Sequence, residues 1–114
     1  MTHDEKTRLI AEFDGWEFVN DAPEEYPNGY WLNKDETNTN ILQLEDMNYD
    51  LSYDWLMPVW HKFRDLRFRG NIVSVFAHSS QKDKIIEELT NGNEETLFAA
   101  LAEAIEWFNT TKKQ

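Results

Sequence analysis

The chain has 114 residues, 40% of them hydrophobic and 14% aromatic, and its formal net charge is −11 at pH 7. This length suits one hydrophobic core, so we expect a single domain over residues 1–114, and the apolar content excludes a disordered acidic tail. The chain has no cysteine, which excludes disulfides and thiolate metal sites; together with a polar start and the lack of any apolar run of about 18 residues, this predicts a cytoplasmic protein.

The first predicted element is a helix that begins at a capping box. Thr2 and Glu5 have the spacing at which a hydroxyl and a carboxylate cap the first turn. Apolar residues follow at helical spacing as far as Phe13, and Gly15 then ends the helix. We expect this short helix to bury one face.

Three short strands are predicted after this helix. Residues 16–19 favour a strand with its aromatic residues on one side, and residues 20–29 form a loop because they are rich in proline, asparagine, glycine and acids. Residues 30–32 and 41–44 favour two further strands, separated by a polar run. An antiparallel hairpin would join these two.

The clearest helix is predicted from Ser52 or Asp54 to Leu66. Its apolar residues recur at spacings of three and four, and we expect them to face the core: Trp55, Leu56, Val59, Trp60, Phe63 and Leu66. Pro58 is expected near the helix start, where a missing amide proton costs little.

The last third of the chain is predicted to hold one strand and two helices. Residues 72–77 are β-branched and apolar, which favours a central strand after a turn at Gly70 and Asn71. Residues 80–89 favour a helix, although a returning strand is the alternative on so short a run. Apolar residues from Leu97 to Phe108 predict a helix that ends near Asn109. The fold class is therefore α+β, with a three- or four-stranded, mostly antiparallel sheet and helices packed on one of its faces.

The negative charge is concentrated in one part of the sequence. Residues 9–61 contain twelve carboxylates and one base, Lys34, so this segment alone sums to −11. A short basic segment follows, with Lys62, Arg64, Arg67 and Arg69 against a single Asp65. Such a charge distribution disfavours direct binding to nucleic acid or to a membrane surface and favours a basic protein partner. The alternative is that the acidic surface serves only to keep the protein in solution.

Few residues offer catalytic or metal-binding chemistry. His3, His61 and His78 are scattered and no HExxH spacing exists, so we predict no metal site and no cofactor. The alternating oxygen side chains between Asn33 and Thr39 resemble a calcium loop, but the required glycine is missing and Leu44 stands where a bidentate glutamate belongs.

The alternative to a binding protein is a small enzyme or ligand-binding domain. In it, His61 or His78 would act with a neighbouring carboxylate, because a histidine pKa lies close to neutral pH. Carboxylates are so abundant in this chain that a neighbour for either histidine is expected by chance.

Three short segments of the chain carry a resemblance to known proteins. They read Ile-Ala-Glu-Phe at 10–13, Tyr-Asp-Trp-Leu-Met-Pro-Val at 53–59 and Ile-Glu-Trp-Phe-Asn at 105–109. In these segments the chain resembles small uncharacterised phage and prophage proteins, especially of Bacteroidota, that end in a Trp-Tyr-Asn-like helix; Phe108 stands where those proteins have tyrosine. The resemblance implies a shared fold and a phage-type accessory role.

The predicted function is therefore that of a non-enzymatic interaction protein. Its acidic segment would dock on a basic partner, and the spaced carboxylates could mimic nucleic-acid phosphates and so inhibit a nucleic-acid-binding defence protein. Trp31 would be an aromatic anchor of the interface if it is exposed. The predicted partner-binding residues are Glu24, Glu25, Asp35, Glu36, Glu45, Asp46, Asp50, Asp54 and Trp31.

Overall fold

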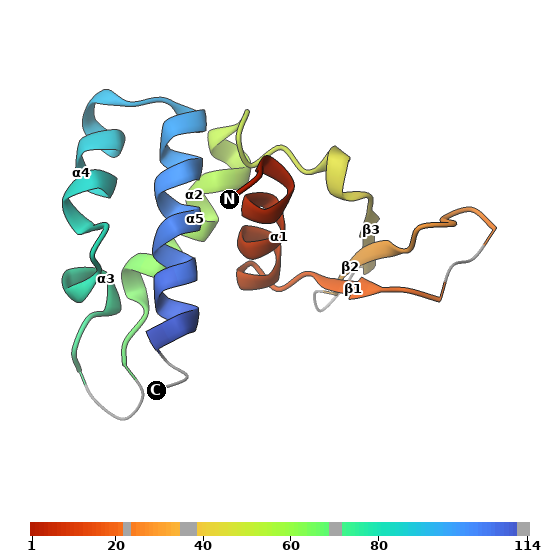
Figure 1. Cartoon of the computed structure of the whole chain (residues 1–114), viewed down its shortest axis with the longest axis horizontal. Helices are drawn as coiled ribbons and strands as arrows, with labels where there is room; N and C mark the ends of the chain where they lie inside the picture. The colour runs from red at the N-terminus through yellow and green to blue at the C-terminus, as the bar shows by residue number, and fades with distance from the viewer. Residues whose placement is uncertain (22–23, 35–38, 69–71, 112–114) are drawn as a thin grey trace.

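The computed structural model describes residues 1–21, 24–34, 39–68 and 72–111 of the chain. In chain order the elements are α1 (His3–Phe13), β1 (Glu17–Val19), β2 (Tyr30–Lys34), β3 (Thr39–Leu42), the 3-10 turn η1 (Leu44–Asp46), α2 (Tyr53–Asp65), α3 (Val75–His78), α4 (Lys82–Asn91) and α5 (Glu94–Thr111). The α+β class with a three-stranded antiparallel sheet is confirmed. Figure 1 shows the helices gathered in one body and the sheet beyond α1. Within the described ranges, no helix has both the length and the apolar character to cross a membrane.

Local sequence signals set both ends of α1. The hydroxyl of Thr2 accepts a hydrogen bond from the amide of Glu5 (3.1 Å), as the capping box predicts. At the other end Gly15 has a φ of 100°, and the amides of Gly15 and Trp16 donate to the carbonyls of Glu12 and Ala11. This is a Schellman motif, which satisfies carbonyls that the last turn would otherwise leave without partners.

The sheet has the order β1-β2-β3, and its register separates two faces. Phe18, Trp31 and Leu42 are cross-strand partners and share the inner face, toward the helices. On this face Trp31 is buried and Leu42 packs against the core. The third strand was predicted at residues 41–44, but β3 begins and ends two residues earlier, at Thr39 and Leu42, and Leu44 is the first residue of η1.

The hydrophobic core lies mainly between helices. Leu97, Leu101 and Ile105 of α5 are fully buried, and α1, α2 and α4 all contact this helix. The predicted helix at 52–66 is confirmed as α2, and the middle of its apolar stripe is buried. Pro58, however, is the sixth residue of α2 rather than part of its first turn. The carbonyl of Asp54 therefore receives no amide from residue 58.

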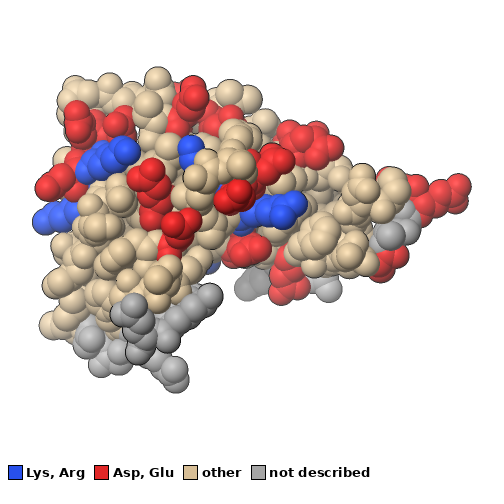
Figure 2. Space-filling view, viewed as in Figure 1, with Lys and Arg blue, Asp and Glu red and all other residues tan. Residues whose placement is uncertain are grey.

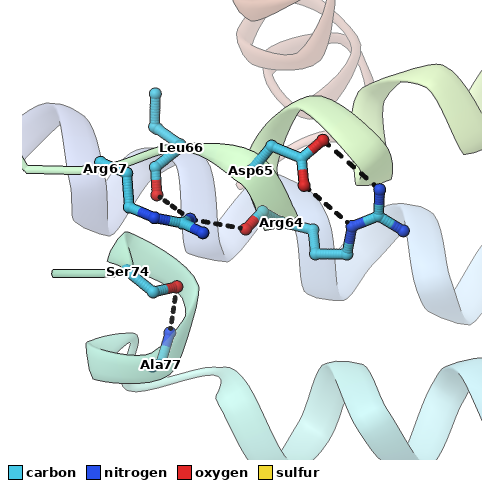
Figure 3. A network of polar contacts seen from close by, with 6 residues as sticks. All are labelled: Arg64, Asp65, Leu66, Arg67, Ser74 and Ala77. Atoms are coloured by element: carbon cyan, nitrogen blue, oxygen red, sulfur yellow. Dashed lines mark hydrogen bonds and ion pairs between the residues drawn. The ribbon is translucent and has the colours of Figure 1, made fainter. Parts of the chain in front are cut away.

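The strand predicted at residues 72–77 is wrong. Ser74 makes a single antiparallel bridge with Arg67, and the chain then forms the short helix α3. The hydroxyl of Ser74 accepts a hydrogen bond from the amide of Ala77 (3.2 Å), so Ser74 caps α3 (Figure 3). Phe76 packs edge-on against Trp60 of α2, with ring centroids 4.9 Å apart. Contacts with α2 thus replaced the sheet pairing that the β-branched composition favours. The predicted turn at Gly70 and Asn71 lies outside the described residues.

The predictions for the last two helices are confirmed. Residues 80–89, for which a strand was the alternative, form most of α4, and Ile85 is its buried residue. α5 begins after Asn93, whose side-chain oxygen accepts from the amide of Thr96 (3.0 Å) while the Thr96 hydroxyl accepts from the amide of Asn93 (2.9 Å). This reciprocal pair of bonds caps the first turn of α5.

Candidate functional site

The predicted partner-binding carboxylates lie on three separate elements. Glu24 and Glu25 are in the loop between β1 and β2, Glu45 and Asp46 are on η1, and Asp54 is in the first turn of α2. All five of these residues are exposed. Asp35 and Glu36 lie outside the described residues. Figure 2 shows acidic side chains at many places on the face in view, with lysine and arginine among them. The carboxylates are therefore spread along a surface and do not form one compact cluster.

These exposed carboxylates are not neutralised by the basic segment at 62–69. In the described part of the chain, no lysine or arginine lies within ion-pair distance of the five residues. Arg64 instead bonds Asp65 of its own segment (3.1 Å), and this bond lowers the pKa of the Asp65 carboxyl (Figure 3). Arg67 donates to the carbonyls of Arg64 and Leu66. Lys62 donates to the carbonyl of Phe13, and Arg69 lies outside the described residues.

Asp50 differs from the other predicted residues because it has an internal partner. Its carboxylate lies 2.9 Å from Nε2 of His3, at the start of α1, and its side chain is only 21% exposed. This contact ties the turn before α2 to the N-terminal helix. Asp50 therefore helps to position these two segments, while its predicted role in partner binding stays a prediction.

A second internal polar contact joins residues that the sequence analysis did not single out. The hydroxyl of buried Tyr49 donates a hydrogen bond to Asp14 at the end of α1 (2.6 Å). Burial raises the pKa of the Asp14 carboxyl, while the bond from Tyr49 and the charge of Lys62 act in the opposite direction. Burial and the nearby Asp14 also raise the pKa of the Tyr49 hydroxyl. No sequence motif links two residues 35 positions apart, so only the tertiary structure reveals this pair.

Trp31 does not meet the condition set for an interface anchor. It is 5% exposed and belongs to the core, because its position in the central strand points it toward the helices. The aromatic residue at the surface here is Phe18, which is 50% exposed and whose ring lies 5.4 Å from that of Trp31. Arg8 and Glu12 of α1 complete a small cavity of about 120 Å³ beside these two rings.

The two histidines proposed for an enzyme lie on different helices, and neither lines the cavity beside Phe18 or two larger cavities. His61 is exposed on α2, whereas His78 is exposed at the end of α3 with Nδ1 3.1 Å from the carbonyl of Ser74. The largest of these cavities, about 650 Å³, lies against α5 and contains neither histidine; its lining consists of Met1, Gln81, Glu103, Glu106, Trp107, Thr110 and Thr111. Within the described ranges, no three histidine or acidic side chains come together as metal ligands do.

Comparisons with known proteins give no family or homologue. No protein-family model, no curated protein and no solved structure matches the chain.

Proposed function

We propose that this protein is a non-enzymatic binding module that docks on a basic protein partner. The observation that carries the proposal is the set of exposed carboxylates on the β1–β2 loop and η1: in the described ranges, no ion pair joins Glu24, Glu25, Glu45 or Asp46 to a basic residue. Charges left free on a surface attract and orient an oppositely charged partner over a distance set by ionic strength.

The charge of the whole chain supports the same proposal. A formal charge of −11 on 114 residues repels nucleic acid and anionic lipid, so a basic protein is the complementary partner. We further propose that this partner is a nucleic-acid-binding protein whose phosphate-binding groove the carboxylates occupy, as a phage-type inhibitor of host defence would do. The absence of cysteine supports action in the cytoplasm.

The test is to isolate the protein with its bound partner from the native host and to measure the affinity of that complex as salt is raised. Changing Glu24 and Glu25 together to glutamine should weaken binding about tenfold at low salt, because this double substitution removes two attractive charges. The double substitution of Glu45 to Gln and Asp46 to Asn should act similarly. Both effects should shrink at high salt.

A matched control separates the position of the charges from their number. Glu87 on α4 and Glu95 on α5 are also exposed, so changing both to glutamine removes the same charge from the helical body. This control should leave the affinity within about twofold of the parent protein. An affinity that changes neither with salt nor with the substitutions at Glu24 and Glu25 would refute the proposal. A partner that still binds duplex DNA normally while in the complex would refute the mimicry of nucleic acid.

A further inference from the structure

The outer face of the sheet carries apolar residues that lie outside the hydrophobic core: Ile41 is exposed, and Val19, Tyr30 and Leu32 are partly exposed. By the strand register, Glu17, Leu32 and Ile41 are cross-strand partners and alternate with the inward-facing Phe18, Trp31 and Leu42. Successive side chains of a strand point to opposite faces, so the first three point away from the helices. Ile41 is 43% exposed.

Two further apolar residues extend this face along the sheet. Val19 of β1 and Tyr30 of β2 are partners in the same register, and the ring of Tyr30 lies 5.4 Å from that of Tyr26 in the preceding loop. Val19, Tyr30, Leu32 and Ile41 are all absent from the hydrophobic core and from the residues that pack against it. We name these four residues the outer sheet face.

Such a face is unusual for an antiparallel sheet with one side toward water. The solvent side of a sheet of this kind normally alternates with the core side and is polar. Here apolar side chains lie on both sides of the central strand, since Trp31 is buried on one and Leu32 lies on the other. Contiguous exposed apolar surface with a polar rim is typical of protein interaction sites.

The charge around the outer sheet face determines which partner fits it. Glu17 stands directly opposite Leu32 and is exposed, and the carboxylate of Asp21 lies 3.5 Å from the hydroxyl of Tyr30. A second copy of this chain would bring further carboxylates against Glu17 and Asp21, and like charges in direct contact are unfavourable. A segment that carries lysine or arginine beside apolar residues would neutralise them.

We propose that the outer sheet face is the docking surface for a basic amphipathic segment of the partner, with its apolar residues on Leu32 and Ile41 and its cations beside Glu17 and Asp21. This inference rests on the proposed function. It adds which face of the protein binds the partner and that the partner's segment alternates basic and apolar residues. Charge steers the approach of the partner, and burial of the apolar residues then holds the complex together.

The test uses two blocked octapeptides of equal charge, alternating Lys-Val and alternating Lys-Ser. Fluorescence anisotropy of the labelled peptides gives their affinities, and amide chemical shifts of the protein locate the bound peptide. The Lys-Val peptide should bind about tenfold more tightly than the Lys-Ser peptide, because only its valines can cover the outer sheet face. The largest shifts should fall on Leu32, Ile41 and their neighbours.

Substitutions then link this preference to the outer sheet face. The double variant Leu32→Ser and Ile41→Ser should abolish the tenfold preference, and the single variant Ile41→Ser gives the same test if the double variant does not fold. The matched control changes Leu51 and Ile72 to serine, which are 71% and 92% exposed and lie outside the sheet. The control should keep the preference.

Each other outcome counts against the inference in a distinguishable way. Equal, salt-dependent binding of the two peptides would overturn the inference but leave the acidic docking function intact. Shifts centred on another face, or a dimer in sedimentation that Ile41→Ser dissociates, would show a different surface or a second copy as the occupant. Failure of both peptides to bind would overturn the inference and count against the proposed function as well.

Discussion

Gly29 lies where the β1–β2 loop packs closely against β1. Its replacement by alanine tests how tightly this part of the sheet is packed. Its φ of 87° is in the left-handed region, where a side chain costs about 1 to 2 kcal/mol. A Cβ added there would lie 2.7 Å from Cζ of Phe18 and 2.8 Å from the carbonyl oxygen of Val19. The ring can turn, but the carbonyl belongs to the strand backbone and cannot move without disturbing the sheet.

Gly15 provides the matched control for this substitution. Its φ is 100°, but a Cβ added there would meet no heavy atom within 4 Å. Gly15→Ala should therefore lower the free energy of unfolding by the conformational term alone, about 1 to 2 kcal/mol. Gly29→Ala should add a further cost of about 1 to 3 kcal/mol, which is typical of an overpacked site.

Urea denaturation followed by circular dichroism measures both free energies of unfolding on the same scale. The difference between the variants isolates the steric term, because the backbone term is common to both. Equal losses of stability, within about 0.5 kcal/mol, would show that β1 and the loop rearrange freely around residue 29 and would refute the reasoning.

Three further predictions concern the interior. Tyr49→Phe should lower the free energy of unfolding by about 1.5 to 3 kcal/mol at pH 7, where its hydroxyl bonds charged Asp14, and by about 1 kcal/mol at pH 3; equal losses at the two pH values would contradict this. Because burial raises the folded-state pKa of Asp14 above 3.8, the folded chain binds the Asp14 proton more tightly than the unfolded chain does. The stability that Asp14 contributes is therefore present below pH 3.8 and is lost as the pH rises through its folded-state pKa. Asp14→Asn should remove this dependence of the free energy of unfolding on pH. Leu101→Ala should lower the free energy of unfolding by about 2 to 5 kcal/mol because Leu101 is fully buried; Leu51→Ala, at a residue 71% exposed, should change it by less than about 0.5 kcal/mol in the same urea experiment.

The success of the sequence predictions follows the range of the interactions involved. α1 was predictable because Thr2, Glu5 and Gly15 act on the backbone within a few residues of themselves. α2 and α5 were predictable because their apolar residues recur with the period of the helix. The strand predicted at 72–77 failed because strand formation needs a neighbouring strand, and in the described ranges this segment pairs with residues 66–68 through one bridge, between Ser74 and Arg67.

The candidate site shows the same division. The acidic segment was visible in the sequence because charge is a property of residue type, and Glu24, Glu25, Glu45 and Asp46 are exposed as expected. Exposure of an apolar residue depends instead on what covers it. Trp31 and Leu32 are neighbours in one strand, yet Trp31 is buried in the core and Leu32 is outside it. No local sequence pattern indicates which of the two faces the helices.

By itself, the sequence determined the α+β class, the positions of four helices and the concentration of negative charge in residues 9–61, since these depend on composition, periodicity and local capping. Only the tertiary structure decided the internal pairs of Asp14 with Tyr49 and of His3 with Asp50, and the apolar outer sheet face. The physical reason is that burial and pairing depend on which distant segments contact each other. These contacts minimise the free energy of the whole chain and not that of any one segment.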